Sequence, residues 1–237
     1  MKNTITMICH NRPAYLTRAL HSIGGADLTG YSALHIFAEP SDSPEMQYAL
    51  ATPHTHIPET LEVVVHNNPK RQGVDHNGYQ AVSYAFEQLK ADLNVHIEED
   101  IIISPDALRL SRWYGLNAAA FHEPVMCLCL HNHGGEPINE RNVHYMWTVY
   151  NFSPYGWAAT KENWKQWFQP EWFTNRWSPD GKIRFGWDWS INYHSEKTHA
   201  VKVMVPAVSR ANTIGEFGGV NMTPEQWRST FADHKML

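Results

Sequence analysis

The sequence of 237 residues has few cysteines and no long apolar run. Its three cysteines, Cys9, Cys127 and Cys129, are odd in number and show no pairing pattern, which argues against a disulfide framework. No segment approaches the roughly 20 apolar residues that a helix needs to cross a bilayer. The first residues, MKNTITMICHNRP, also lack the apolar stretch of a signal peptide. We therefore expect a cytoplasmic protein without a membrane span.

An excess of positive charge is also missing. The formal net charge is −5, so the chain as a whole lacks the signature of a nucleic-acid-binding protein, although a local basic patch is compatible with it. Hydrophobic residues make up 43% and charged residues 18%, which predicts a sizeable core and excludes general disorder. Internal repeats and clear linkers are absent. The length suits a single domain, which we divide into the halves 1–106 and 107–237.

The first half alternates apolar runs with segments of helical periodicity. A helix is expected from Pro13 to Gly24, and a second one includes Tyr79 to Leu89. The runs that predict buried strands are 5–9, 34–38, 61–65 and 95–97. This alternation predicts an α/β fold with a mostly parallel sheet flanked by helices.

Polar side chains follow three of these strands where each strand ends. The first strand runs into His10-Asn11-Arg12, the third into HNNPKR with Lys70 and Arg71, and the fourth into Glu98-Glu99-Asp100. Ligands of such sheets bind at the carboxyl ends of the strands. The sequence therefore predicts one rim at which basic and acidic groups gather.

The acidic triplet at residues 98–100 lies between apolar residues on both sides. Carboxylates are almost never fully buried unless they are paired. A hard divalent cation prefers carboxylate oxygens and often takes its other ligands from water and substrate phosphates. A cation site is one explanation of the triplet, and a strand that simply ends at the surface is the other.

The second half is rich in aromatic residues between Tyr145 and Tyr193, with further strands expected at 125–130 and 201–208. Cys127 and Cys129 alternate on the first of these strands, most simply as two small buried side chains, with a metal-binding pair as the alternative. His131-Asn132-His133 is expected to form a loop after that strand. The alternatives are a metal ligand or a sugar contact from one of its histidines.

Asp188 stands between Trp187 and Trp189. A carboxylate in such low-dielectric surroundings tends to have a raised pKa, which makes it a better general base for an acceptor hydroxyl. Asp is also a favoured helix N-cap residue, so a cap for a helix that begins at Trp189 is the alternative.

Several of these motifs together resemble the GT-A glycosyltransferases. The triplet, the apolar run after it and Ser104-Pro105-Asp106 are similar to the DXD region of the N-acetylglucosaminyltransferase I family, although the middle position here is Glu99. Other stretches resemble segments of that family in the same order, over roughly 220 residues: MICHNRPAYLTRAL, KRQGVDHNGYQAVSYAF, NFSPYGWA, FGWDW and VPAVSRANTIGEFGGVN.

The resemblance implies a role for each matching residue. Asp100 would hold Mn²⁺ or Mg²⁺ on a nucleotide diphosphate, Glu98 would face the sugar and Glu99 the ribose, and Asp188 would be the catalytic base. Four further contacts to the nucleotide sugar are implied. His10 and Asn11 would line the base pocket, Arg12, Lys70 and Arg71 would contact the diphosphate, and His76 or Asn77 would contact the ribose. A segment with Arg210 and Asn221 would close over the diphosphate. The sugar and acceptor pocket would contain Trp157, Trp187 and Trp189.

The expected activity is therefore metal-dependent, inverting transfer of a sugar from a nucleotide sugar, most simply a UDP-sugar, to an acceptor hydroxyl. The missing signal peptide departs from the family's Golgi members and favours a bacterial or phage-infected cell. An aromatic and basic segment at 161–187 suits either a glycan or a hydroxylated nucleic-acid base as the acceptor. Retention of configuration on the same fold and an inactive sugar- or nucleotide-binding module are the alternatives.

Overall fold

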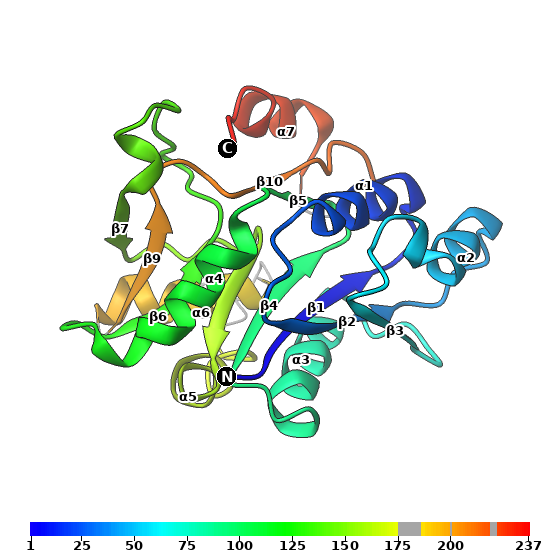
Figure 1. Ribbon diagram of the computed structural model, residues 1–237, viewed down its shortest axis with the longest axis horizontal. Coiled ribbons are helices and arrows are strands. Elements are labelled where there is room, and N and C mark those ends of the chain that lie inside the picture. Colours follow the sequence, from blue (N-terminus) through cyan, green and yellow to red (C-terminus); the bar gives the residue numbers. More distant parts are fainter. Residues whose placement is uncertain (175–185, 200, 219–221) are drawn as a thin grey trace, which may run out of the picture.

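The computed structural model describes residues 1–174, 186–199, 201–218 and 222–237 (Figure 1). Its centre is an eight-stranded sheet in the order β3-β2-β1-β4-β8-β6-β9-β7. Strands β8 and β7 run antiparallel to their neighbours, and the other described pairs in this sheet are parallel. The strands are β1 (Asn3–Cys9), β2 (Tyr31–Ala38), β3 (Glu62–Asn67), β4 (Leu93–Glu98), β6 (Val125–Cys129), β7 (Met146–Val149), β8 (Trp157–Thr160) and β9 (Lys202–Pro206).

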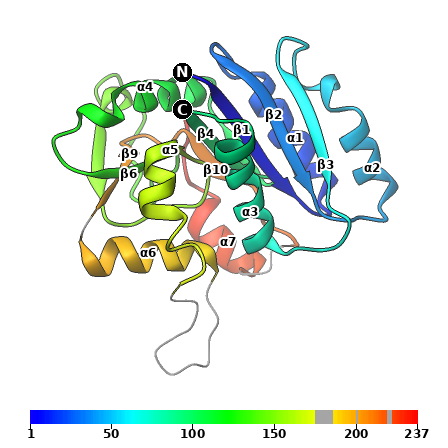
Figure 2. The ribbon, with the colours of Figure 1, turned by 90° about the horizontal axis from the view of Figure 1, so that it is seen from below.

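Helices cover both faces of this sheet (Figure 2). Helices α1 and α4 pack with the odd-numbered residues of β1 on one face, whereas α3, α5 and α6 lie on the other. The helices are α1 (Pro13–Gly24), α2 (Pro44–Ala51), α3 (Val74–Ser83), α4 (Ala107–Asn117), α5 (Lys161–Asn163), α6 (Trp187–Thr198) and α7 (Pro224–Phe231). The predicted α/β fold with a mostly parallel, helix-flanked sheet is confirmed.

Shorter helical turns complete these elements. Helix α3 continues into the π-helical turn η2 (Tyr84–Gln88), and α5 continues into η5 (Trp164–Phe168). The 3₁₀ turns are η1 (Pro53–Thr55), η3 (Ala118–Ala120) and η4 (Asn142–His144). Within the described part of the chain, no helix has the length and apolar character needed to cross a bilayer.

The unit β1-α1 follows the sequence pattern closely. All seven residues of β1 are buried, and Pro13 occupies the first turn of α1, where a missing N–H costs nothing. Leu16, Leu20 and Ile23 point from α1 into the core. At the end of this helix a Cβ on Gly24 would lie only 1.9 Å from the carbonyl oxygen of His56, so the close approach of the two segments requires a glycine.

A second, two-stranded sheet joins the middle of the chain to its C-terminal part. Strand β5 (Ile101–Ile103) pairs antiparallel with β10 (Ala211–Thr213). Strand β5 begins directly after the acidic triplet. The backbone N–H of Ile214 donates to the carbonyl oxygen of Asp100 at 2.7 Å, so the C-terminal segment is fixed beside the triplet.

Stacked aromatic rings form the core of the second half. Trp157 lies parallel to Phe168 with ring centroids 4.6 Å apart, and Trp172 lies parallel to Trp187 at 4.1 Å. Three strands of this half, β7, β8 and β10, are not among the predicted strands. The Sγ atoms of Cys127 and Cys129 are 3.8 Å apart, and both are free, buried thiols in this core. This agrees with the simpler interpretation of that pair.

Candidate active site

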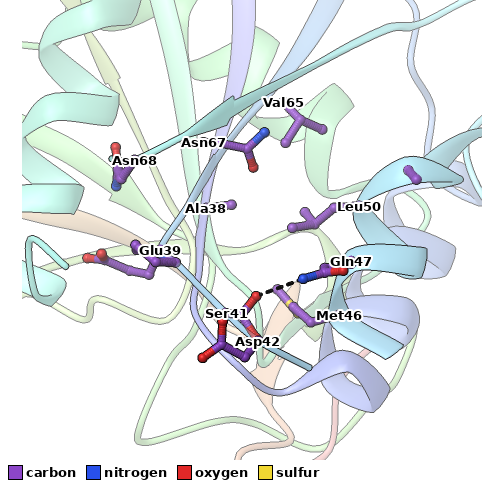
Figure 3. A pocket seen from close by; sticks show the side chains of 12 residues that line it. Ala38, Glu39, Ser41, Asp42, Met46, Gln47, Leu50, Val65, Asn67 and Asn68 are labelled. Carbon is purple, nitrogen blue, oxygen red and sulfur yellow. Dashed lines mark hydrogen bonds between the residues drawn. The ribbon is translucent and has the colours of Figure 1, made fainter. Parts of the chain in front are cut away.

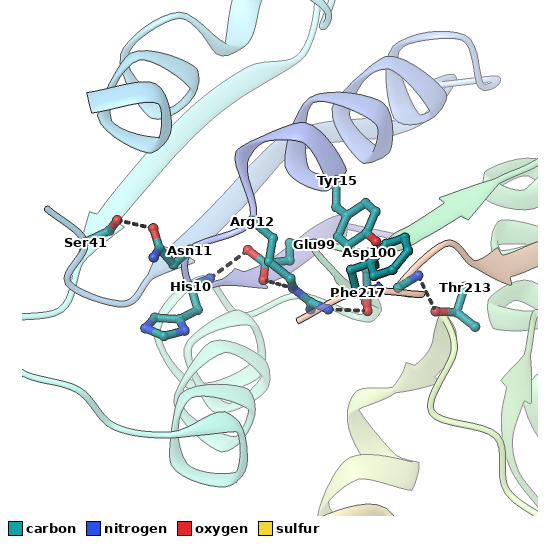
Figure 4. A network of polar contacts seen from close by, with 10 residues as sticks. His10, Asn11, Arg12, Tyr15, Ser41, Glu99, Asp100, Thr213 and Phe217 are labelled. Carbon is teal, nitrogen blue, oxygen red and sulfur yellow. Dashed lines mark hydrogen bonds and ion pairs between the residues drawn. The ribbon is translucent and has the colours of Figure 1, made fainter. Parts of the chain in front are cut away.

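The predicted rim forms where β1 and β4 end. These strands pair in parallel with Ile8 opposite Glu98, so the turns that follow them lie side by side. Arg12, at the start of α1, reaches across to the triplet (Figure 4). Its Nε is 2.7 Å from Oε1 of Glu99, and its Nη1 is 2.9 Å from Oδ2 of Asp100. The guanidinium therefore bridges two of the three carboxylates.

Glu99 has a structural position that differs from its predicted ribose contact. Its side chain is only 4% exposed, and its second oxygen accepts the backbone N–H of His10 at 2.8 Å. A buried carboxylate requires such donors, because the cost of burying an unpaired charge is high. Glu99 thus fixes the turn between β1 and α1 and points away from an open surface.

Asp100 lies on the open side of the same turn, with 14% of its side chain exposed. The C-terminal segment 214–218 packs over it: a Cβ on Gly215 would lie 2.1 Å from Oδ2 of Asp100. The backbone N–H of Phe217 donates to the hydroxyl of Tyr15 at 2.9 Å, which ties this segment to α1 (Figure 4). A side chain at position 215 would therefore displace the carboxylate of Asp100.

Glu98 and Asp188 converge on this turn from opposite halves of the chain. Burial, followed by repulsion from Asp100 and Asp188, raises the pKa of Glu98 to about 8. Burial is also the main cause that raises the pKa of Asp188, while backbone N–H groups at the start of α6 partly offset it. Burial and the three nearby carboxylates raise the pKa of Tyr155 as well. The site thus holds carboxyl groups whose environments favour proton uptake.

The start of α6 places Asp188. Gly186 is the N-cap of this helix and Asp188 lies in its first turn, so the alternative role as an N-cap is wrong. The backbone N–H of Trp187 donates to Oδ1 of Asp75, on α3, at 3.1 Å. The Nε1 of Trp172 donates to the carbonyl oxygen of the same residue at 2.9 Å. Asp75 was not predicted as a site residue, because its role depends on a contact 112 residues away.

A cavity of about 430 Å³ lies next to the rim, at the carboxyl ends of β2 and β3 (Figure 3). Its walls include Glu39, Ser41, Asn67 and Asn68, with Met46 and Leu50 from α2. The hydroxyl of Ser41 donates to Oδ1 of Asn11 at 2.6 Å, so the cavity adjoins the first turn. The carboxylate of Glu39 accepts the backbone N–H groups of Gln72 and Gly73, which fixes the loop after β3.

Other predicted donor contacts lie in different surroundings. Lys70 and Arg71 are exposed on that loop. His76 is exposed, and its ring packs against that of Phe173 at 5.0 Å. Asn77 is only 1% exposed and bonds to Asn68 and to the carbonyl oxygen of Phe37. Its amide is therefore used inside the fold, which favours His76 over Asn77 as the ribose contact.

Arg210 also differs from its predicted position near the diphosphate. It is 4% exposed, its Nε lies 3.0 Å from both oxygens of Asp106, and its Nη2 donates to the carbonyl oxygen of Val143 at 2.7 Å. The guanidinium thus joins the start of α4 to the segment at Val143 and helps to hold β10 beside β5. Asn221, like Arg176, Trp177, Lys182 and Arg184 of the basic segment, lies outside the described residues.

The three tryptophans predicted to line a sugar pocket separate into two classes. Trp157 and Trp187 are 0% and 2% exposed and belong to the stacked core, so in this structure neither ring forms an open wall. Their burial follows from the pairing of β8 between β4 and β6 and from the stack on Trp172. Trp189 is 56% exposed and directly follows Asp188.

The residues at the rim fit a hard divalent cation. Among the described residues, no three His, Cys, Asp or Glu side chains are grouped so as to hold a metal ion. Asp100 nevertheless offers hard carboxylate oxygens, and Mg²⁺ often takes one or two carboxylates and completes its shell with water and phosphate oxygens. The guanidinium of Arg12 shows that this position stabilises positive charge.

The loop after β6 brings three histidines together. His131 is buried, with Nδ1 3.1 Å from the carbonyl oxygen of Ala211. Its ring centroid lies 4.8 Å from that of His133 and 4.3 Å from that of His234, near the C-terminus. Tyr155 packs against the first two rings, so this cluster adjoins the carboxylates.

Comparison with known proteins shows the fold. No family model and no curated protein matches the sequence. Among solved structures, S. aureus TarS 1-349 has a TM-score of 0.56 at 14% identity, covering 89% of this chain and 60% of that one. The mannosyltransferase PcManGT from Pyrobaculum calidifontis, in complex with GDP-Man and Mn²⁺, has a TM-score of 0.54 at 14% identity, covering 88% and 57%. The chain thus spans about three fifths of their length. It has the α/β fold of GT-A glycosyltransferases.

Proposed function

We propose that this chain is a metal-dependent, inverting GT-A glycosyltransferase that moves a sugar from a nucleotide sugar to an acceptor hydroxyl. The observation that carries the proposal is the convergence of Glu98, Asp100 and Asp188 beside Arg12. It occurs at the carboxyl ends of the strands, where ligands of α/β sheets bind. The mannosyltransferase of similar fold, solved with GDP-Man and Mn²⁺, supports a nucleotide sugar and a divalent cation.

The donor would lie along the rim. The cavity beside Asn11 and Ser41 suits the nucleobase, and the diphosphate would extend toward Asp100. A divalent cation bound at Asp100 would neutralise charge on the departing nucleoside diphosphate. His76, Lys70 and Arg71, exposed on neighbouring segments, remain candidate ribose and phosphate contacts.

Asp188 would act on the acceptor. Its raised pKa suits a carboxylate that must take a proton from a hydroxyl in the transition state. The acceptor hydroxyl would give its proton to Asp188 while its oxygen attacks the anomeric carbon. The bond from that carbon to the diphosphate would break, and the configuration would invert in one displacement. The exposed ring of Trp189 lies beside this carboxylate and would stack on the acceptor, either a glycan or a hydroxylated nucleic-acid base.

The decisive experiment is a screen of UDP- and GDP-sugars by thermal shift with Mn²⁺, followed by release of nucleoside diphosphate from the best donor. We expect a donor that stabilises the wild type only with the metal present and is slowly hydrolysed. The variant Asp100→Asn should lose the metal-dependent shift. Binding without any turnover, in water or with acceptors, would indicate the binding-module alternative, and NMR of the product's anomeric centre would identify a retaining enzyme.

A further inference from the structure

The side chain of Arg12 occupies the place at Asp100 that the proposed function assigns to a cation. Its Nη1 is 2.9 Å from Oδ2 of Asp100, while only 22% of the arginine side chain is exposed. The same guanidinium holds Glu99 through a different nitrogen, Nε. One positive charge thus serves two carboxylates through two separate contacts.

These two contacts are not equally replaceable. Glu99 is buried and also held by the backbone N–H of His10, so its pairing with Nε belongs to the fold of the turn. Asp100 is more exposed than Glu99, and its carboxylate accepts fewer hydrogen bonds from the surrounding structure. Its contact with Nη1 is the one that can be given up: the planar guanidinium turns as one unit, and Glu99 keeps the backbone N–H of His10 when it does.

A divalent cation and Nη1 compete for the same carboxylate. A cation such as Mg²⁺ binds a carboxylate oxygen at about 2.0–2.1 Å, well inside the distance at which Nη1 now lies from Oδ2. Both carry positive charge, and their repulsion in this half-buried position is screened less than at the surface. A cation on this carboxylate therefore weakens the arginine contact.

The segment above limits where Arg12 can go. A Cβ on Gly218 would lie 3.3 Å from Cδ of Arg12, and Phe217 is fixed to Tyr15. The guanidinium also lies over the ring of Tyr15, 5.5 Å from its centroid. Because its stem is enclosed on these sides, the end of the side chain can turn but the arginine stays at the rim, where a diphosphate would be bound.

We propose that Arg12 is a placeholder cation: it neutralises Asp100 when no metal is bound and transfers its Nη groups to the diphosphate when metal and nucleotide bind together. This inference rests on the proposed function. Its consequence is that Arg12 opposes binding of the metal alone, and that the nucleotide removes this opposition by giving the guanidinium a new anion. Arg12 is therefore a positioning residue that makes metal and donor binding cooperative.

The test measures Mn²⁺ binding directly, by the EPR signal of free Mn²⁺, with and without saturating UDP or GDP, whichever the wild type binds. For the wild type we expect the nucleotide to tighten Mn²⁺ binding about tenfold or more. Arg12→Gln should bind Mn²⁺ alone several-fold more tightly than the wild type and should lose most of the nucleotide effect. Arg18→Gln, which removes an exposed charge from the same helix, should behave as the wild type.

Arg12→Gln leaves the buried Glu99 without its arginine partner, which destabilises the turn, so the double variant Arg12→Gln/Glu99→Gln is measured beside it. A melting curve shows that each variant is folded. If neither folded variant binds Mn²⁺ alone more tightly than Arg18→Gln does, the placeholder role is wrong while the proposed function stands. If the wild type binds no Mn²⁺ under any condition, the metal-dependent function fails and this inference fails with it.

Discussion

The rim, at the ends of β1 and β4, and the aromatic core, built around β8 and α6, are stabilised in different ways. The rim, formed by Arg12, Glu98, Glu99 and Asp100, pairs charges between turns 87 residues apart in the sequence. The aromatic core packs rings against one another in stacked and edge-on pairs, such as the stack of Trp172 on Trp187 and the edge-on pair of Phe152 and Trp157. The difference teaches that neither region alone builds the site. The rim supplies charge, and the core supplies the low-dielectric surroundings.

Asp188 is where the two regions meet. Its position comes from the aromatic core, because it follows Trp187 in the first turn of α6. Its charge acts on the rim, because it contributes to the raised pKa of Glu98. Substitutions in the rim and substitutions in the aromatic core can therefore test the rate of transfer and the stability of the fold separately.

The largest effect is expected for Asp188→Asn. Loss of the carboxylate removes the proposed base, and general-base catalysis typically contributes about 100- to 10,000-fold to the rate. Single-turnover transfer should fall by that factor while donor binding, measured calorimetrically, stays within about twofold. The matched control is Glu196→Gln, an exposed carboxylate on the same helix, which should leave the rate unchanged. Equal turnover of Asp188→Asn and the control would place the base elsewhere.

The next largest effect is on the aromatic core. Trp157→Ala should lower the free energy of unfolding by roughly 3–5 kcal/mol, because it opens a cavity beside Phe168. Trp189→Ala, which truncates a ring that is 56% exposed, should change it by less than about 0.5 kcal/mol. Urea denaturation of both variants checks the contrast. Similar losses in the two would mean that Trp189 is also part of the packed core.

A smaller, pH-dependent effect is expected at Glu98. Its pKa is raised from 4.5 to about 8 in the folded chain, so the folded state binds more protons in that window. The stability that Glu98 contributes is therefore present at low pH and is lost as the pH rises toward 8. Glu98→Gln removes this dependence.

The measurement is the melting temperature of both proteins from pH 5 to pH 9. As the pH rises, the melting temperature of Glu98→Gln should increase by a few degrees relative to that of the wild type, since 1 kcal/mol corresponds to roughly 2–4 °C for a chain of this size. Glu196→Gln again serves as the control. A gap that stays constant with pH would show that Glu98 is ionised in the fold, which would weaken the link between the rim and the core.

The sequence predicts the rim well because its evidence is local. The apolar runs at 5–9 and 95–97 each end in polar residues, and parallel strands bring those ends to one edge. The pairing of Arg12 with Glu99 is not predictable in this way. It depends on the register of β1 against β4, which no local pattern encodes.

The aromatic half is harder to predict for a physical reason. A tryptophan suits a sugar platform and a buried core equally well, and only its neighbours decide. Trp157 is buried because β8 lies between β4 and β6, which are distant in the sequence. Strand β8 has only four residues, and they show no alternation of polar and apolar side chains that would predict a strand. The same holds for Asn77, a polar residue on the buried face of α3, whose partners come from the ends of two strands.

The pairing of β5 with β10 has a consequence for the synthesis of this protein. Every residue of the triplet has been made by residue 100, yet Asp100 gains its neighbour Gly215 and its bond to Ile214 only when β10 has been translated. A nascent chain that stops earlier has the carboxylates without the segment that encloses them. The rim therefore matures late, and fragments of the first half should bind metal and nucleotide poorly even when their own strands have formed.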